Sequence, residues 1–300
     1  MDISVPHFIC IGAQRSGTTW LYETLIRHPD VFLPPIKELH YFDSLDQTVP
    51  VGYRFHERRY RLKKKRNTCL RSLLDVAQGR VSNPRLVISF WKNYFLGDGS
   101  FSWYQHLFSQ AAKGGKITGE ITPAYSLLST EYIQKLKQLN SDLKIIYVLR
   151  NPIDRSFSQA TKDLIRSKNL KASDVSDEDF INFFKSDICA RRSNYHDSLV
   201  NFRNIFSEDK LLICFFDEIQ DNPKALIGRI CEFIDVEPLS ETSIVKGQVN
   251  SSTHLVDRMP EKVASFLVET YLPSIEQLMN DVGGYAKEWY REIMTYRSEA

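Results

Sequence analysis

The residues with the clearest capacity for chemistry form a glycine-bounded stretch near the start of this 300-residue chain. It follows a short apolar run and leads into a helical pattern that stops at His28. The backbone N–H groups of such a turn and helix start attract an oxyanion, so a phosphate fits here. The residues of this first candidate phosphate site are Arg15, Ser16, Gly17, Thr18, Thr19 and Trp20.

The spacing of this stretch resembles that of a nucleotide-triphosphate loop, but its cation is displaced. The separation of Gly12 and Gly17 is that of the triphosphate loop. Thr18 stands where that loop has its lysine, and the cation is Arg15 instead. An ordinary ATP or GTP hydrolase needs its lysine on the β- and γ-phosphates, so the pattern points away from that class of enzyme.

A second candidate phosphate site follows the apolar run from Lys144 to Leu149. We expect Arg150 at the carboxyl end of a strand, Pro152 at the start of the next helix and Ser158 two turns along it. Arginine offers a planar fork for phosphate, and the serine hydroxyl adds a donor. Taken alone, Arg150 could equally be a structural ion-pair residue. Two such sites at one sheet edge favour a ligand with two phosphate groups.

The best candidate for a proton acceptor lies in residues 35–43, PIKELHYFD. If this segment is extended, Glu38 and His40 point to the same side and share one pocket. The alternative is that Glu38 pairs with Lys37 or Arg15 merely to hold the loop. His254 is a third candidate base, although a lone loop histidine is more often solvated.

The elements that must position these residues alternate between strand and helix patterns. A helix is predicted after Asn222 as N-cap, with Pro223 at its first position. This alternation predicts a mostly parallel sheet flanked by helices, whose ligands lie at the carboxyl ends of the strands. The predicted strands are His7 to Ile11, Lys116 to Ile121, Lys144 to Leu149 and Leu211 to Phe216.

Two stretches depart from this pattern. Residues 54–71 carry nine Lys or Arg against one acid, and residues 162–179 are polar. We therefore expect one domain over residues 1–300 with a basic insertion at about 50–100 and a polar loop at about 162–180.

Composition favours a folded chain, because 42% hydrophobic and 12% aromatic content can supply a large core. The cysteines Cys10, Cys69, Cys189, Cys214 and Cys231 are widely spaced and form no C-x-x-C, which predicts free thiols in a reducing compartment. No segment approaches the ~20 apolar residues of a membrane span, and no signal peptide is evident, so we expect a cytoplasmic protein. There is no H-E-x-x-H, Cys/His cluster or EF-hand loop to indicate a metal site.

The two candidate phosphate sites together resemble those of PAPS-dependent sulfotransferases, in which Lys or Arg precedes Ser/Thr-Gly-Thr-Thr. Residues 119–125, GEITPAY, are similar to a segment of the heparan sulfate type and its bacterial relatives. The resemblance implies a P-loop-like sulfotransferase fold, 3′-phosphoadenosine 5′-phosphosulfate (PAPS) as donor, adenosine 3′,5′-bisphosphate (PAP) as product and no required metal. The donor-binding residues that it adds to the first site are Arg150, Ser158, Tyr195, Asn250 and Ser251.

The same resemblance implies catalytic roles for four residues. Glu38 would be the general base, with His40 supporting it, and Arg15 would neutralise the leaving phosphate during in-line transfer. His254 would be an alternative base. Trp20 and Tyr125 could flank the adenine or the acceptor, although core packing is the commoner fate of such aromatics.

The departures from the heparan type bear on the acceptor. Ile121 replaces a lysine of that type, and a late Lys-Gly loop is absent after Asn250. We therefore expect a hydroxyl, less readily an amine, on a small molecule, lipid, glycan or carrier-bound acyl chain. The basic run is either a solvated helix or a docking face for an acidic protein partner. The residues of that face are Arg54, Arg58, Arg59, Lys63, Lys64 and Lys65.

Two other functions compete with this interpretation. A phosphate-loop small-molecule kinase needs Mg²⁺ and a lysine on the transferred phosphate, which this loop lacks. A non-catalytic module could hold nucleic acid on the basic run, but the run offers few stacking aromatics, namely Tyr53, Phe55 and Tyr60. We therefore expect no nucleic-acid partner.

Overall fold

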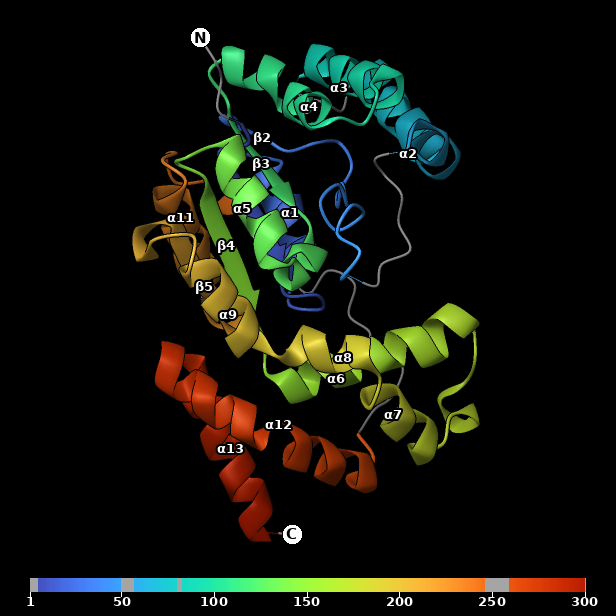
Figure 1. Ribbon diagram of the computed structural model, residues 1–300, viewed down its shortest axis with the longest axis vertical. Helices are drawn as coiled ribbons and strands as arrows, with labels where there is room; N and C mark the ends of the chain where they lie inside the picture. The colour runs from blue at the N-terminus through green and yellow to red at the C-terminus, as the bar shows by residue number, and fades with distance from the viewer. Residues whose placement is uncertain (1–4, 50–56, 80–82, 246–258, 300) are drawn as a thin grey trace.

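The core of the protein is a five-stranded parallel sheet, seen in a computed structural model that describes residues 5–49, 57–79, 83–245 and 259–299. The strands lie in the order β2-β3-β1-β4-β5, and every adjacent pair is parallel (Figure 1). Their bounds are β1 Phe8–Gly12, β2 Val31–Phe32, β3 Ile117–Ile121, β4 Lys144–Leu149 and β5 Leu211–Phe215.

The four strands expected from the sequence are confirmed, and a fifth was missed. β2 has only two residues, too few for an apolar pattern to reveal. The sheet is buried on both faces, because Phe8 and Cys10 join one apolar cluster while Ile9 and Ile11 join another. β1 lies in the middle, so its carboxyl end opens onto both neighbouring strand ends.

Helices cover the two faces of the sheet. α1 (Thr18–Leu25) and α11 (Pro223–Phe233) pack in the cluster that holds Phe8, and α5 (Thr130–Leu139) and α9 (Tyr195–Arg203) pack in the cluster that holds Ile9. The predicted start of α11 is confirmed, since the Asn222 side chain accepts a hydrogen bond from the Ala225 N–H at 3.0 Å. The remaining α-helices around the sheet are α6 Pro152–Ala160, α8 Asp187–Ser193 and α10 Phe216–Asp221.

Three helices inserted between β2 and β3 gather beyond that side of the sheet (Figure 1). They are α2 (Arg58–Ala77), α3 (Pro84–Leu96) and α4 (Phe101–Lys113). The basic run does form a helix, but it is not solvated all round, because Arg61 and Cys69 are buried and Arg61 contacts Tyr94 of α3 and Trp103 of α4. Its cationic side chains therefore belong to two different faces.

The polar segment at 162–180 is not simply a loop. It continues α6 through a single π-helical turn and short 3₁₀ turns and then enters α7, whose Phe180 is buried. The buried Phe180 anchors the end of this segment, and the polar composition of the segment as a whole does not reveal it.

The last helices, α12 and α13, lie at the end of the molecule opposite α2 (Figure 1). The bounds of these helices and of the short 3₁₀ and π turns are α7 Asp177–Phe184, α12 Glu261–Val282, α13 Tyr285–Glu299, η1 Pro123–Leu127, η2 Thr161–Ile165, η3 Arg166–Lys168, η4 Ala172–Asp174, η5 Glu208–Lys210 and η6 Glu241–Ser243.

Candidate active site

The first phosphate site joins the end of β1 to the start of α1. Gly17 is the N-cap of α1, with φ of 78°, and a Cβ there would lie 2.3 Å from the Ile219 side chain. Only glycine fits this position, because both the backbone conformation and the space exclude a side chain. No side chain in the described part of the chain caps α1, so the N–H groups of its first turn face the loop as donors for an anion.

The second phosphate site contacts the first directly. Arg15 donates from Nε and Nη2 to the Ser158 hydroxyl at 3.2 and 3.1 Å. Arg150 donates from Nη1 to the Arg15 carbonyl at 3.1 Å, and Tyr195 donates its hydroxyl to the Arg150 carbonyl at 2.9 Å. Tyr195 therefore positions the end of β4, and the two sites form one basic cluster.

This cluster fits a ligand that carries two phosphate groups. The Ser16 hydroxyl and the Arg150 Nε are buried without a hydrogen-bond partner among the described residues, so both remain available as donors. Burial lowers the pKa of the Arg15 guanidinium, and the charges of Arg150, Arg166 and Arg155 lower it further. Bringing these cations together disfavours their charged forms, and an anion between them relieves that cost.

Not every residue assigned to the donor reaches the cluster with its side chain. The ring of Trp20 is only 2% exposed and donates its N–H to the Val245 carbonyl at 2.8 Å. Tyr125 is fully buried, and its hydroxyl accepts from the Tyr41 N–H at 3.0 Å. Both rings are therefore packed in the core, which was the alternative to their flanking a ligand. Thr18 is buried and Thr19 half-buried at the start of α1.

Glu38 and His40 do come together, but not for the predicted reason. The segment is not extended: φ is 64° at Glu38 and 53° at His40, in the left-handed region. Glu38 Oε2 nevertheless lies 3.3 Å from His40 Nε2, and His40 Nδ1 lies 2.7 Å from Asp43 Oδ2. Lys37 Nζ donates to the other oxygen of Glu38 at 2.5 Å. The strained backbone thus holds a Glu–His–Asp chain whose first carboxylate meets a lysine.

Asp43 was not predicted as a site residue, although its spacing of three from His40 could have indicated it. Its carboxylate fixes the ring of His40 from the side away from Glu38. Burial alone would lower the pKa of His40, but hydrogen bonds to Asp43 and Glu38 raise it to about 9. Burial pushes the pKa of Glu38 upward, yet His40 and Lys37 outweigh it and hold that pKa well below its ordinary value. At neutral pH Glu38 is therefore a carboxylate and His40 an imidazolium.

The Glu38 chain lies at the same sheet edge as the phosphate sites. The Glu38 N–H donates to the Ile121 carbonyl at 3.2 Å, at the end of β3. The Thr122 N–H, one residue on, donates to the Cys10 carbonyl at 3.0 Å in β1, just before the Gly12–Gly17 loop. Ile121 itself points into the core and is 2% exposed. A carboxylate and a basic cluster on neighbouring strand ends can bind an anionic donor and remove a proton beside it.

Similarity to known proteins identifies the family of this chain. A model of the sulfotransferase family matches residues 6–241, most of the chain. This chain is a member of the sulfotransferase family. It is 24% identical to carbohydrate sulfotransferase 15 of Rattus norvegicus over 262 residues, which cover 79% of this chain and 45% of that protein. It is 25% identical to the heparan sulfate glucosamine 3-O-sulfotransferase 3B1 of Mus musculus over 55% of this chain and 29% of that protein. The chain thus spans less than half the length of these curated relatives.

Solved structures share the fold of this family member. A sulfotransferase from Alicyclobacillus acidocaldarius matches with a TM-score of 0.61 at 18% identity, over 96% of this chain and 99% of that one. Mouse sulfotransferase SULT7A1 complexed with PAP matches with a TM-score of 0.50 at 15% identity, over 94% of this chain and 88% of that one. The P-loop-like sulfotransferase fold expected from the sequence is therefore confirmed. Neither the kinase nor the nucleic-acid module is favoured.

Three predicted site residues of this family member, His254, Asn250 and Ser251, lie outside the residues that the structure describes. Within the described ranges, no group of three His, Cys, Asp or Glu side chains is placed to hold a metal ion. None of the helices described here has both the length and the apolar character to cross a bilayer.

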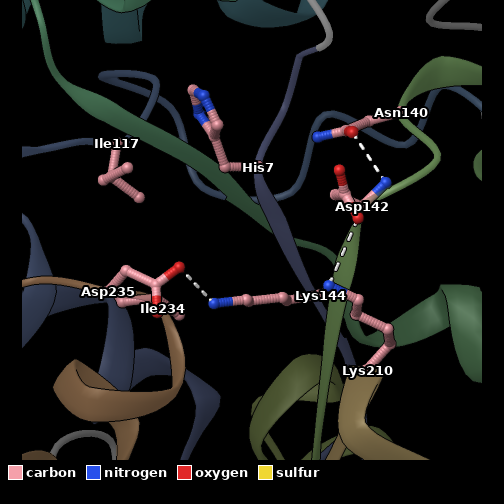
Figure 2. Close-up of a pocket in the computed structure, with 8 residues that line it drawn as sticks. All are labelled: His7, Ile117, Asn140, Asp142, Lys144, Lys210, Ile234 and Asp235. Atoms are coloured by element: carbon pink, nitrogen blue, oxygen red, sulfur yellow. Dashed lines mark hydrogen bonds and ion pairs between the residues drawn. The ribbon is translucent and has the colours of Figure 1, made fainter. Parts of the chain in front are cut away.

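A cavity on the opposite edge of the sheet is not part of this site (Figure 2). It lies among the amino-terminal ends of the strands, where Lys144 pairs with Asp235 at 2.5 Å and Lys210 with Asp142 at 3.4 Å. Because each lysine there already has a carboxylate partner, the cavity has no charge to offer a phosphate. The basic cluster at the carboxyl ends of the strands, by contrast, offers positive charge to a phosphate.

Proposed function

We propose that this protein transfers a sulfuryl group from PAPS to a hydroxyl of a small-molecule, lipid, glycan or carrier-bound acyl acceptor. The observation that carries the proposal is the contact of Arg15 with Ser158, which makes one basic cluster of two phosphate sites. A nucleotide with phosphate groups at both its 3′ and 5′ positions matches such a cluster. Membership of the sulfotransferase family supports the reaction.

In this proposal the first turn of α1, Ser16 and Arg15 hold the 5′ end of the donor, and Arg150 and Ser158 hold the 3′-phosphate. The donor supplies the sulfuryl group, which already carries its own charge. Arg15 offsets the negative charge that develops on the leaving phosphate oxygen as the sulfur–oxygen bond breaks. The backbone N–H groups of the loop and the Arg15 side chain can stabilise this charge without moving, because the loop holds the N–H groups and Ser158 holds Arg15.

Glu38 is the proposed general base. It takes the proton of the acceptor hydroxyl while the acceptor oxygen bonds to sulfur. His40 is unsuited to that role at neutral pH, because its pKa is raised to about 9 and it is already protonated. Its proposed role is to hold the Glu38 carboxylate in place, with Asp43 holding His40 in turn.

Thermal unfolding with and without PAP tests the donor assignment. At a concentration one hundred times its dissociation constant, a specific ligand adds about 2.7 kcal/mol of apparent stability. We expect that gain with PAP and without added metal, and a smaller one with adenosine 5′-phosphate, which lacks the second phosphate. A larger gain with ATP and Mg²⁺ would contradict the proposal and favour a kinase. Transfer from labelled PAPS to a panel of hydroxylated acceptors then tests the reaction.

We also propose that the outer face of α2 docks an acidic protein partner such as a carrier. Arg59, Lys63 and Lys64 are exposed on it, and Leu70 and Leu74 are exposed further along the helix. Arg58 is also exposed, but it shares the helix face of Arg61 and donates from Nε to the Phe95 carbonyl of α3 at 2.8 Å, so it does not belong to the outer face. Arg54 lies outside the described residues, and Lys65 does not belong to this face because it is half-buried. If docking occurs, raising the salt concentration weakens binding of a carrier-bound acceptor but not of the free one. An acceptor Michaelis constant that ignores ionic strength would contradict it.

The thiols support the expected compartment. All five cysteines are buried and unpaired, so a reducing compartment such as the cytoplasm suits the described chain. Measuring five titratable thiols in the unfolded protein purified from its native source would test this.

A further inference from the structure

The hydroxyl of Tyr125 contacts the segment that carries the proposed base. Tyr125 is fully buried, and its hydroxyl oxygen accepts hydrogen bonds from the backbone N–H groups of Tyr41 at 3.0 Å and Phe42 at 3.4 Å. These two residues stand between His40 and Asp43 in the chain. The hydroxyl therefore fixes the backbone that joins the imidazole to its carboxylate partner.

The segment needs such a contact because its backbone is strained. Glu38 and His40 have φ of 64° and 53°, in the left-handed region that disfavours residues with a Cβ. A conformation of this kind persists only where surrounding contacts hold it. One contact precedes His40, where the Glu38 N–H donates to the Ile121 carbonyl at 3.2 Å, and the two bonds to Tyr125 follow it. The strained histidine is thus held from both sides.

Tyr125 is itself held at the sheet edge of the phosphate sites. It belongs to η1, which follows β3, and its N–H donates to the Thr122 carbonyl at 3.0 Å. The Thr122 N–H donates in turn to the Cys10 carbonyl of β1 at 3.0 Å, just before the loop that holds Arg15. The position of the proposed base relative to the basic cluster therefore depends on the sheet, with Tyr125 as the connection.

A buried acid sets the direction of the Tyr125 hydroxyl. Glu120, near the end of β3, is 1% exposed, and the hydroxyls of Tyr104 and Thr122 donate to its carboxylate. Burial raises the pKa of this carboxyl to about 7, and hydrogen bonds, that of Tyr125 among them, oppose the rise. A phenol has one proton to donate, so donation to Glu120 leaves the lone pairs of the oxygen for the two N–H groups.

These hydrogen bonds are separable from the packing of the rings. The ring of Tyr125 lies 5.7 Å from that of Phe42, edge to face, and the ring of Tyr41 stacks on that of Tyr104 at 4.8 Å. Both are contacts between rings and do not require the hydroxyl of Tyr125. Removing that oxygen alone therefore keeps the aromatic packing and deletes the bonds that hold the segment.

We propose that Tyr125 is a positioning residue for proton transfer: its hydroxyl holds the backbone of Tyr41 and Phe42 so that His40 keeps the Glu38 carboxylate in place. The role in catalysis rests on the proposed function, in which Glu38 is the base. Tyr125 acts through this segment and does not touch the acceptor or the donor.

The variant Tyr125→Phe tests the effect on turnover. It should lower kcat by about 10- to 100-fold, as expected for a displacement of about 1 Å at the reacting groups. The KM for PAPS and the stabilisation by PAP should stay unchanged, because the phosphate sites do not depend on this hydroxyl. Tyr271→Phe is the matched control: this buried tyrosine of α12 also loses a hydroxyl, one that is bonded to Ser156 at 3.0 Å. Its kcat should equal that of the wild type.

The pKa of His40 reports the geometry of the segment without turnover. Burial lowers this pKa, but hydrogen bonds to Asp43 and Glu38 raise it to about 9. In Tyr125→Phe the displaced ring should lose part of these bonds, so its pKa should fall toward 6.5. NMR titration of labelled histidines measures it, with His40→Gln to assign the signal. A loss of fold stability alone would lower the unfolding temperature and leave the pKa of His40 unchanged.

The proposal is overturned if Tyr125→Phe keeps the kcat of the wild type or if its His40 titrates as in the wild type. Should the variant not fold, hydrogen exchange of the wild-type protein decides. Slow exchange of the Tyr41 and Phe42 amides supports the contact, and exchange as fast as that of exposed amides overturns it. A wild-type protein that transfers nothing from PAPS would count against the proposed function instead, and the titration of His40 would still test the role of Tyr125.

Discussion

Arg15 and Ser158 are 143 residues apart in the chain, yet the guanidinium of one donates twice to the hydroxyl of the other. The loop after β1 supplies Arg15, and the helix after β4 supplies Ser158. Because β1 and β4 are adjacent and parallel, their carboxyl ends bring the two residues together. The contact therefore depends on strand order, and it joins two anion sites that are separate in the sequence.

Arg15→Met should separate ligand binding from fold stability. Arg15 is crowded by the charges of Arg150, Arg166 and Arg155, so its removal should leave the unliganded protein as stable as wild type or up to about 1 kcal/mol more stable. The stabilisation by PAP should fall by most of the expected 2.7 kcal/mol. Differential scanning calorimetry with and without PAP measures both, with the surface variant Arg27→Met as control. A variant that PAP still stabilises fully would remove Arg15 from the donor site.

Glu38→Gln should lower turnover by ~10²- to 10⁴-fold, the usual contribution of a general base. The amide keeps the size of the side chain but cannot accept a proton, so binding of PAP should be unchanged. Single-turnover transfer from labelled PAPS measures the rate, and Glu131→Gln, in an exposed ion pair with Lys135, is the matched control. Turnover close to that of the control would exclude Glu38 as the base.

The stabilising contribution of His40 to the fold should be lost as the pH rises. Its pKa is raised from 6.5 to about 9 by Asp43 and Glu38, so its contribution is complete below pH 6.5 and is lost as the pH passes 9. The loss is at most about 3 kcal/mol, at 1.36 kcal/mol per pKa unit. Urea unfolding of wild type and His40→Gln between pH 6 and 10 measures it. The two pH profiles should diverge below pH 9, and parallel profiles would show that His40 is not charged in the folded state.

Glu120 predicts a second pH effect at lower pH. It is fully buried, and burial raises its pKa to about 7, although it accepts hydrogen bonds from the hydroxyls of Tyr104 and Thr122. Its ordinary value is 4.5, so stability should fall as the pH rises from 4.5 through 7. Glu120→Gln should abolish that fall, although it replaces one of the two accepting oxygens with an NH2 donor, and Glu120→Ala should cost about 2–4 kcal/mol at any pH. A wild-type stability that is flat over this range would be inconsistent with a buried, titrating Glu120.

Interactions between near neighbours in the chain were sufficient to predict much of the architecture. The strand patterns, the N-cap at Asn222, the helix start at Pro152 and the glycine turn at Gly17 depend on near neighbours in the chain, and each is where the sequence placed it. The same holds for the two phosphate segments, because each is a strand end followed by a helix start.

Contacts between distant segments were decided only by the tertiary structure. Trp20 and Tyr125 entered the core, and Lys65 turned inward while its neighbours on α2 stayed exposed. Sequence composition treated the whole basic run alike, as a solvated helix or as a docking face, because composition does not show which side of a helix packs against the protein. That side is set by the packing of Arg61 on Trp103, and the pairing of Arg15 with Ser158 is set by the order of strands in the sheet. Both are properties of the folded chain, since they depend on residues that the sequence keeps far apart.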